Sequence, residues 1–475
     1  MSKAGYLLKN TGILAIGSFS SKILVFLLVP LYTTILTTGE YGTYDLILNS
    51  INLLLPILTL NISDAVLRFP LDKNADSTRI IHIGLVFTIS SSLLLLAFQF
   101  LPSAPWGTIN GIAWLSPLYF SLALYQLLQL FARGMERFTQ VAIAGVISTA
   151  ITVALNIIFL LPLQMGLSGF FLANILGQLC PCIYLLLSLR TCIFKRPSKL
   201  DPKHALLRSM IRYSLPLAIN TVSWWFVNVS DVYIVAGLCG LDATGQYAIA
   251  FKIPAILNVL QSIFLQAWQV SAVIDFDKDD KDGFLRKSYN LIQSAMALSC
   301  SILIALAPLV ARYMFANEFY EGWIYIPLLL VYTVFNTMSG VLGGLYMATK
   351  DTTSITVSVL LGAVVNVGAG IALVLLLGPI GAAASSLLAG LVTWLYRVAK
   401  LGRHMNVSFG IPRSFGIYGL LTAQAIIIIC PLPATAATLV QIALIAILGL
   451  LLRREISAGY SKARDEILRK SHRKS

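Results

Sequence analysis

Charged residues are scarce in this chain. Asp, Glu, Lys and Arg make up 11% of its 475 residues, and the mean hydropathy is +0.83. A typical soluble domain has about 25% charged residues, so this chain lacks the charge to cover a water-facing surface. Long apolar runs, each near the roughly 20 residues that cross a bilayer, instead predict an all-α polytopic membrane protein.

Catalytic and metal-binding signatures are also missing. No Gly-x-x-x-x-Gly-Lys phosphate loop occurs, and the four histidines form no ligand cluster. The six cysteines lie mostly in or beside apolar runs, without a metal-binding or thioredoxin spacing. The external loops are too short for a set of catalytic carboxylates. We therefore expect a protein that is not an enzyme, with no catalytic residues, no metal and no cofactor.

Helix-breaking residues and charged residues divide the chain into about 14 apolar segments. Ten-residue alternating strand patterns are absent, so we expect each segment to be a helix. The predicted spans are 11–36, 41–67, 80–101, 111–131, 139–161, 167–189, 212–238, 244–272, 289–312, 322–347, 352–377, 379–399, 412–430 and 434–452.

The basic residues predict the orientation of these spans. Arg312 lies on one side of the membrane, Lys22 and Lys252 fall within spans, and all other lysines and arginines lie on the opposite side. The positive-inside rule then places both termini in the cytoplasm. This asymmetry also accounts for the net charge of +14 without a nucleic-acid partner, since the basic residues are spread along loops.

The chain resembles itself at an offset of about 206 residues. Thr38-Gly39-Glu40-Tyr41-Gly42 recurs as Thr244-Gly245-Gln246-Tyr247-Ala248, and Asn52 falls opposite Asn258. The offset then drifts: Asn156 matches Asn366, and Gly169 matches Gly381. Such a repeat is typical of transporters with their site between two related halves.

Six spans separate each element from its counterpart, so the two halves should have the same orientation across the membrane. We expect two parallel six-helix lobes followed by two extra helices. The predicted divisions are 1–190 for the first lobe, 191–211 for a basic cytoplasmic linker, 212–400 for the second lobe, 401–452 for the extra helices and 453–475 for a basic cytoplasmic tail.

Polar residues recur on one face of several spans. In 41–67 they lie three or four residues apart from Asp45 to Ser63, and in 212–238 from Asn220 to Asp231. Such faces indicate either a water-filled cavity or polar helix–helix contacts. The residues that we expect to line a cavity between the lobes are Lys22, Asp45, Asn49, Asn52, Arg68, Asn220, Trp224, Asn228, Asp231, Lys252 and Asn258.

Some of these residues have a second interpretation. A lysine at mid-span, such as Lys22, costs about 2.5–3.5 kcal/mol on insertion scales, so it needs water, a carboxylate or an anionic ligand. Lys252 could instead extend to the interface, and Arg68 could be a solvated interfacial residue. Trp224 shares the polar face, whereas the adjacent Trp225 points about 100° away and does not.

Three short runs carry a family resemblance: Ser20-Ser21-Lys22, Pro30-Leu31-Tyr32-Thr33 and Glu40-Tyr41-Gly42-Thr43-Tyr44. With the 14 spans and the two halves, they resemble the polysaccharide-transporter branch of the multidrug/oligosaccharidyl-lipid/polysaccharide flippase superfamily. The resemblance covers essentially the whole chain. It implies a V-shaped pair of lobes with alternating access, in the inner membrane of a bacterium.

The resemblance also implies a substrate, an oligosaccharide such as an O-antigen or lipopolysaccharide unit on undecaprenyl pyrophosphate. Lys22 would then pair with the pyrophosphate, while H⁺, Na⁺ or the membrane potential would drive transport. Membrane lipids, a polysaccharide polymerase and glycosyltransferases are the implied partners. The acidic Asp45 and Asp231 depart from the arginine-rich cavity of related peptidoglycan-precursor flippases. They leave open a multidrug or organic-cation antiporter and, less favoured, a membrane enzyme of glycan assembly.

Overall fold

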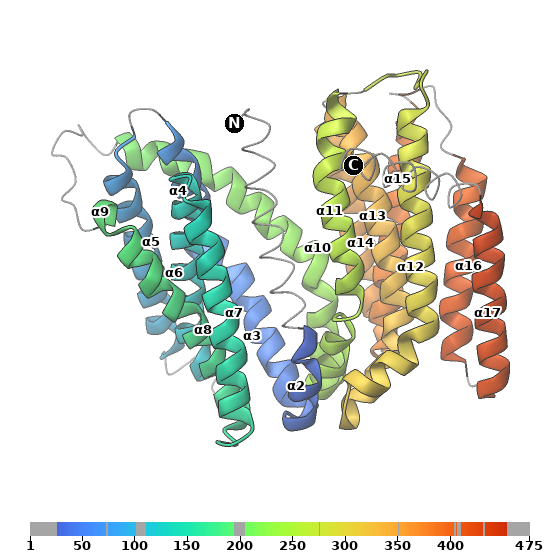
Figure 1. The fold of residues 1–475 in the computed structure, drawn as a ribbon, viewed down its shortest axis with the longest axis horizontal. Helices are drawn as coiled ribbons and strands as arrows, with labels where there is room; N and C mark the ends of the chain where they lie inside the picture. The colour runs from blue at the N-terminus through green and yellow to red at the C-terminus, as the bar shows by residue number, and fades with distance from the viewer. Residues whose placement is uncertain are drawn as a thin grey trace, which may run out of the picture. The chain divides into compact units, whose positions relative to one another are not determined.

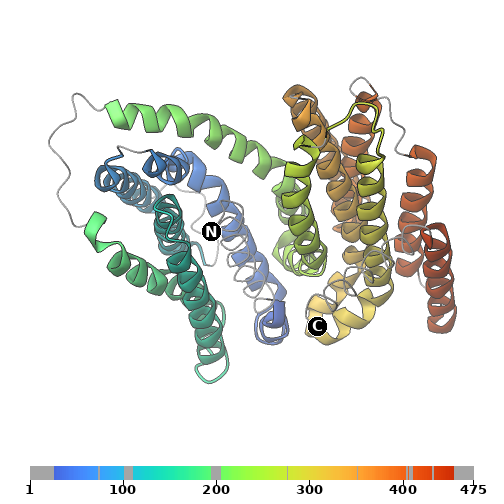
Figure 2. The ribbon, with the colours of Figure 1, turned by 45° about the horizontal axis from the view of Figure 1, so that its top comes forward.

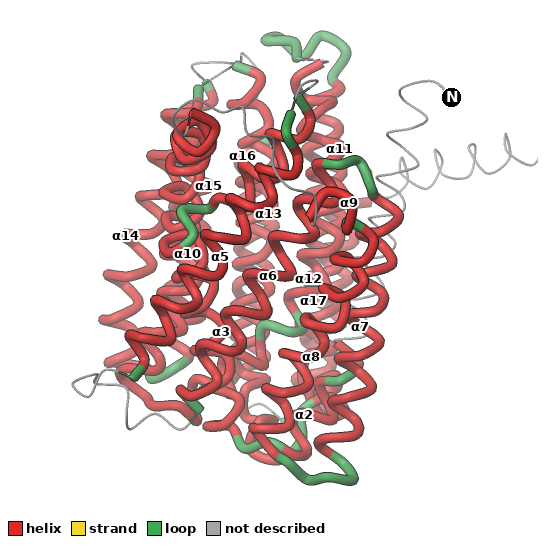
Figure 3. Tube along the Cα trace, turned by 90° about the vertical axis from the view of Figure 1, so that its left-hand side faces the viewer, coloured by secondary structure: helices red, strands yellow, loops and turns green. Residues whose placement is uncertain are grey.

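The structure, a computed structural model, describes residues 26–72, 75–100, 111–193, 205–274, 276–349, 351–402, 405, 410–430 and 433–453. All regular structure in these ranges is helical (Figure 3). The chain forms two compact units that divide between Val229 and Ser230, inside one long helix. The lobe boundaries at 191–211 remain a prediction, since most of that segment lies outside the described ranges.

The first unit contains helices from both sides of the predicted linker (Figure 1). Its elements are α2 (Val29–Ile35), α3 (Thr38–Leu58), α4 (Ile62–Arg68), η1 (Phe69–Leu71), α5 (Ser77–Gln99), η2 (Ile112–Trp114), α6 (Leu115–Gly134), α7 (Phe138–Leu160), α8 (Gly166–Ser188), α9 (Arg190–Ile193) and the beginning of α10 (Ala205–Ala250).

The second unit begins within α10 and continues to the end of the described chain. Its further elements are α11 (Pro254–Ile274), α12 (Phe284–Met314), η3 (Asn317–Tyr325), α13 (Ile326–Ala348), α14 (Thr352–Leu377), α15 (Ile380–Leu401), α16 (Ile411–Ile429) and α17 (Ala434–Leu451). α13 lies at the centre of this unit, where it packs against α11, α12, α15 and α16.

The predicted count of 14 spans is not confirmed. In the described ranges, nine helices are long and apolar enough to cross a membrane, and the number rises to 11 if each of two bent helix pairs is one span. α17 is apolar but shorter than these helices. Most of the predicted first span, 11–36, lies outside the described residues. The chain is therefore an all-α, multi-span membrane protein, and the part that the structure describes holds 9–11 candidate spans.

Several predicted spans are bent or broken, among them 41–67 and 244–272, which hydrophobicity alone does not reveal. The segment 41–67 forms α3 and α4, which meet at an angle of 66°. Leu60 and Asn61 at this bend have φ values of 51° and 53°, a left-handed conformation that costs about 1–2 kcal/mol per residue. The segment 244–272 is likewise interrupted, since α10 ends at Ala250 and α11 begins at Pro254.

Local sequence explains where several helices begin. Thr37 and Glu40 form a reciprocal capping box at the start of α3, in which the Thr37 side chain accepts from the Glu40 backbone N–H. The Asp351 side chain accepts from the Ser354 N–H at the start of α14. Gly240, with φ of 89°, interrupts the helical backbone within α10, between the predicted spans 212–238 and 244–272.

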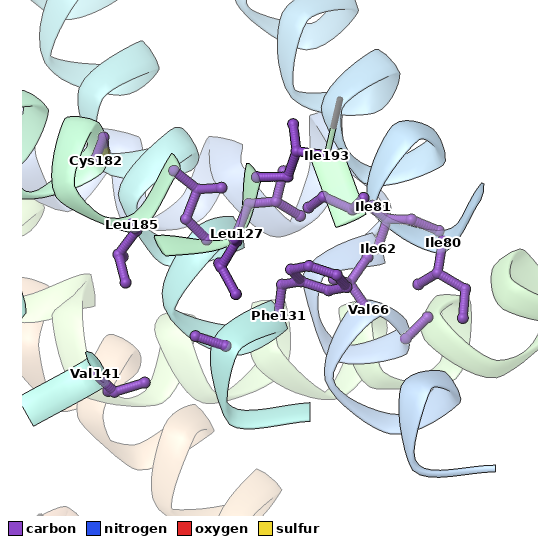
Figure 4. Close-up of a cluster of buried hydrophobic side chains, with 14 of the residues drawn as sticks. Ile62, Val66, Ile80, Ile81, Leu127, Phe131, Val141, Cys182, Leu185 and Ile193 are labelled. Atoms are coloured by element: carbon purple, nitrogen blue, oxygen red, sulfur yellow. The ribbon is translucent and has the colours of Figure 1, made fainter. Parts of the chain in front are cut away.

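A buried apolar cluster holds part of the first unit together (Figure 4). Ile62 and Val66 of α4 meet Ile81 of α5 and Leu127 and Phe131 of α6, and all five side chains are essentially inaccessible. In a membrane, helices associate mainly through such close packing, because lipid tails are as apolar as these side chains.

Glycines bring two helix pairs into close contact at equivalent places in the repeat. A Cβ on Gly169 of α8 would lie 2.8 Å from the Met165 Cβ and 3.0 Å from the Phe159 Cβ. A Cβ on Gly381 of α15 would overlap the backbone of Leu373 in α14. Small residues at such crossings let neighbouring backbones approach. The two halves thus share the same device for packing α7 on α8 and α14 on α15.

The two extra helices, α16 and α17, pack on α12 at the edge of the second unit (Figures 1 and 2). A buried ladder of amides and hydroxyls joins them within the apolar bundle. Ser301 Oγ of α12 donates to Gln424 Oε1 of α16 at 2.7 Å, and Gln424 Nε2 donates to Gln441 Oε1 of α17 at 2.8 Å. Interhelical hydrogen bonds of this kind fix helix register in a membrane.

Candidate functional site

The polar face of α3 divides into an open part and a buried part. Asp45 and Asn49 are half-buried, and Asn52 is exposed. Thr59 and Ser63, further along the predicted face, are 1% and 2% exposed and lie within the first unit. The part of the face available to a ligand is therefore shorter than the sequence pattern predicts.

Asp45 and Asn49 contact each other across one turn of α3. Asn49 Nδ2 donates to Asp45 Oδ2 at 2.8 Å. Lys22, the predicted partner for an anionic ligand, lies outside the described residues. Arg68, at the end of α4, is exposed and forms an ion pair with Asp72 at 2.7 Å. An exposed pair of this kind contributes little to stability.

The first part of α10 contacts α3 through Trp225, the tryptophan that helical spacing places off the predicted polar face. Trp225 Nε1 donates to the Asn49 carbonyl oxygen at 2.8 Å, whereas the predicted Trp224 is 45% exposed. Asn220 and Asn228 are also exposed, and Asn228 Nδ2 donates to the Trp224 carbonyl of its own helix. Helical spacing places residues on one face, but it does not say which face meets the neighbour.

Asp231 lies in a different setting, buried within the second unit. Its carboxylate is 3% exposed and accepts three hydrogen bonds. The donors are the Tyr247 hydroxyl at 2.8 Å, the Ser386 hydroxyl at 3.1 Å and the Val232 N–H at 2.9 Å. These donors come from α10 and α15, so the carboxylate joins the two helices.

Tyr247 and Ser386 were not predicted as site residues. A signal for Tyr247 was present, because it belongs to the repeated motif 244–248. Nothing in the sequence pairs Ser386 with Asp231, which lies 155 residues earlier.

Lys252 and Asn258 occupy the region where α10 gives way to α11. Lys252 is half-buried in the three-residue break between these helices, and its N–H donates to the Ile249 carbonyl at 3.0 Å. Asn258 is exposed on α11. Within the described ranges, the predicted residues of the first unit therefore lie on α3, on the beginning of α10 and, for Arg68, at the end of α4. The second unit holds the buried Asp231 together with Lys252 and Asn258.

The described candidate residues carry groups that can bind a polar ligand. Amides, carboxylates and an exposed indole can hydrogen-bond and stack with a polar ligand. The described residues contain no group of three or more His, Cys, Asp or Glu side chains placed to hold a metal ion.

Several solved structures share this fold. A lipid II flippase MurJ in an inward closed conformation is similar with a TM-score of 0.64 and 15% identity, over 95% of this chain and 99% of that chain. An inward-facing multidrug resistance MATE family transporter gives 0.62 and 15%, over 82% and 98%. A MOP superfamily transporter from Pyrococcus furiosus gives 0.53 and 12%, over 83% and 93%.

The sequence comparisons differ in their outcome. No curated protein matches the chain. The model of one family, described as "Polysaccharide biosynthesis protein", matches residues 7–269. Its members are transporters within the superfamily of MurJ and MATE, so this chain is not an enzyme. With more than half of its length matched, this multi-span membrane protein belongs to the polysaccharide biosynthesis protein family.

Proposed function

We propose that this protein is a flippase for a lipid-linked oligosaccharide. Its substrate is a surface-polysaccharide repeat unit, such as an O-antigen unit, on undecaprenyl pyrophosphate. The protein moves this unit from the cytoplasmic to the outer leaflet of a bacterial inner membrane by alternating access. The observation that carries the proposal is membership of a polysaccharide biosynthesis family in a chain whose fold matches a lipid II flippase over 95% of its length.

The open polar residues of the first unit suit the sugar portion of this substrate. Asn52 and Asn228 present exposed amides, and Trp224 presents an exposed indole. Amides can donate to and accept from sugar hydroxyls, and an aromatic face packs against the C–H face of a sugar ring. The bond from Trp225 to Asn49 holds α3 and α10 together beside these groups.

The cationic residues suit the pyrophosphate. Lys22 lies near the middle of its predicted span, and a phosphate partner would offset its insertion cost of about 2.5–3.5 kcal/mol. Lys252 and Asn258 are further groups that could contact the substrate from the second unit. Arg68 is tied to Asp72 and fits a role at the cytoplasmic entrance.

The proposed setting follows the charge distribution of the chain. Both termini lie in the cytoplasm, as the positive-inside rule predicts. Transport is coupled to H⁺, Na⁺ or the membrane potential. The glycosyltransferases that build the lipid-linked unit supply the substrate, and a polymerase receives the flipped product.

Charge reversal at Lys22 tests the proposal. In cells whose surface polysaccharide depends on this protein, Lys22→Glu should abolish export while the protein remains inserted. Lys22→Arg is the matched control and should retain export, because it keeps the charge. Undiminished export by Lys22→Glu would refute the pyrophosphate-binding role.

A second candidate function is multidrug or organic-cation antiport. The buried Asp231 carboxylate and the MATE-like fold favour it, since a carboxylate can carry a proton or bind a cation. Overexpression should then raise drug resistance, and Asp231→Asn should remove that resistance. A flippase for a lipid-linked glycan would leave drug resistance unchanged.

A further inference from the structure

A groove lies between α5 and α6 of the first unit, apart from the candidate residues of the site. Its cavity volume is about 280 Å³, and its lining comes from these two helices alone. Both helices belong to candidate membrane spans. The lining includes Ile89, Ser92, Leu93 and Leu96 of α5 and Ser116 and Phe120 of α6.

The side chains of the groove differ in burial. Ile89, Leu93 and Leu96 are 48%, 60% and 40% exposed and form its rim. Ser116 is buried and Ser92 is half-buried, so these small side chains lie deeper. Exposed leucine and isoleucine on a membrane span contact lipid tails, which are as apolar as these side chains. The groove therefore opens toward the hydrocarbon of the bilayer.

The two serines of the groove donate their hydroxyl protons to the protein itself. Ser92 Oγ donates to the Thr88 carbonyl at 2.7 Å. Ser116 Oγ donates to Gln99 Oε1, and Gln99 Nε2 donates to the Ile112 carbonyl at 2.9 Å. A polar ligand would lose its hydration and gain little from walls whose donors are already used. A hydrocarbon chain needs no hydrogen bond, so the walls favour an apolar occupant.

The groove also has dimensions that suit part of a lipid tail. The stretch from Ile89 to Leu96 rises about 10 Å along the helix axis, at about 1.5 Å per residue. The hydrocarbon layer of one leaflet is about 15 Å thick, half of the whole core. The volume of about 280 Å³ holds roughly nine groups of the size of water, at about 30 Å³ each. Methylene groups are of similar size, so one chain fits along the groove.

The position of the groove along the two helices indicates a leaflet. α5 begins at Ser77, beside Arg79 on the predicted cytoplasmic side, and the groove lies in the second half of this helix. On α6 the groove lies in the first turns, which follow the loop after α5. With the orientation that the positive-inside rule predicts, both places belong to the outer half of the membrane.

We propose that this groove holds one acyl chain of an outer-leaflet phospholipid, packed lengthwise between α5 and α6. Phospholipid is the source because it is the main component of the bilayer that surrounds the rim. The gain is close packing, since a void beside these side chains would forfeit their dispersion contacts. The inference does not depend on what the protein transports.

Photo-crosslinking of the full-length protein in phospholipid vesicles tests the proposal. The probe is a phosphatidylethanolamine with a diazirine on its acyl chain, added as a small fraction of the lipid, and mass spectrometry maps its adducts. Ile157 and Ile158 of α7 give the baseline, since both are exposed near the outer end of a candidate span. We expect several-fold more adducts per exposed residue on 89–96 and 116–120 than on this baseline. Equal labelling would overturn the proposal.

A matched pair of serine variants localises the chain. Ser92→Phe places a ring in the groove and should lower the adducts on 89–96 and 116–120 to the α7 baseline. Ser90→Phe adds the same ring at an exposed position of α5 that does not line the groove, and it should leave the labelling unchanged. If Ser92→Phe does not fold, the smaller Ser92→Val should still reduce the adducts. Unchanged labelling in a folded Ser92 variant would contradict the proposal.

Two further arms distinguish other occupants. Excess undecaprenyl phosphate should leave the adducts unchanged, whereas their loss would show that a polyprenyl chain takes the groove and would contradict the phospholipid source. Labelling should also be independent of the protein-to-lipid ratio. A loss confined to high protein density would show that a second copy of the chain covers the groove, which would equally overturn the proposal.

Discussion

Tyr41 and Tyr247 occupy the same place in the repeated motif, yet their surroundings differ. Tyr247 is completely buried and donates to the Asp231 carboxylate. Tyr41 is 2% exposed and lies against Phe170, with ring centroids 6.4 Å apart. Tyr247 also packs on the rings of Phe251 and Tyr325. The two halves therefore differ in the buried carboxylate that Tyr247 contacts, rather than in aromatic packing as such.

The residues that follow the paired glycines also differ between the two halves. Gly169 precedes Phe170 and Phe171, whose rings occupy the interior of the first unit. Phe170 also packs on Tyr32 and Tyr44, at centroid distances of 4.5 Å and 4.4 Å. Gly381 instead precedes Ala382 and Ala383. Ser386, further along the same helix, donates to the Asp231 carboxylate.

The comparison shows that two related halves can keep the same helix crossing while the side chains beside it differ. The close crossing of α7 on α8 and of α14 on α15 is common to both halves, and each has a glycine at the contact. The adjacent side chains are free to diverge between aromatic packing and buried polarity. An acidic side chain thereby lies buried inside the second unit, while a glycine is kept at the crossing in both halves.

The largest expected effect comes from breaking the aromatic cluster around Phe170. Phe170→Ala removes a ring that contacts three tyrosines, and the resulting cavity should lower the free energy of unfolding by about 3 kcal/mol or more. Thermal unfolding of the purified protein in detergent measures this loss of stability. Ala382→Ser at the corresponding site is the control and should change stability much less. A small effect of Phe170→Ala would mean that the cluster does not stabilise the first unit.

The paired glycines should respond unequally to alanine. At Gly381 the new Cβ meets the backbone of Leu373, which cannot move aside, so we expect a loss of about 1–3 kcal/mol. At Gly169 the nearest atoms are side-chain Cβ atoms at 2.8 Å and 3.0 Å, so Gly169→Ala should cost less. Equal losses of unfolding free energy for Gly381→Ala and Gly169→Ala would contradict the expectation that the Gly381 crossing is the tighter one.

Removing one hydrogen-bond donor to Asp231 should have an intermediate effect. Tyr247→Phe deletes the hydrogen bond to Asp231, a bond to a charged group that contributes about 1.5–3 kcal/mol. Ser386→Ala deletes the longer bond, at 3.1 Å, and should cost less. The double variant should differ from the sum of the two single variants, because both hydroxyls donate to Asp231 Oδ2. Simple additivity would argue against a shared carboxylate.

The smallest effect, and a stabilising one, is expected from copying the second half into the first. Asn366, the counterpart of Asn156, accepts from the Ser385 hydroxyl at 3.0 Å, and the residue opposite Ser385 at the offset of 212 is Ala173. Ala173→Ser should give Asn156 the same donor and raise the free energy of unfolding by about 1 kcal/mol or less. Ala173→Val is the control, since it adds volume without a donor and should destabilise. A destabilising Ala173→Ser would show that the two asparagines are not equivalent.

Much of the fold could be predicted from sequence. Apolar runs and basic loops predicted an all-α, multi-span protein, which is confirmed. The resemblance to the polysaccharide-transporter branch is also confirmed. The bends were missed, because the hydrophobicity of a segment does not report backbone conformation such as the left-handed Leu60 and Asn61.

The site was less predictable for a similar reason. Helical spacing correctly grouped Asp45 with Asn49, which are hydrogen-bonded one turn apart. It did not identify Trp225 as the residue that meets α3, since that depends on how two helices are rotated. Ser386 is brought to Asp231 only by tertiary packing of α15 on α10.

The most direct test of the proposed function is transbilayer movement in purified proteoliposomes. A fluorescent oligosaccharide on undecaprenyl pyrophosphate is incorporated into both leaflets, and a membrane-impermeant quencher reports the outer pool over time. We predict that the wild-type protein equilibrates the labelled lipid between leaflets and that Lys22→Glu does not, while Lys22→Arg does. If the wild-type protein moves the lipid no faster than protein-free vesicles, the proposal that it is a flippase for this substrate is wrong.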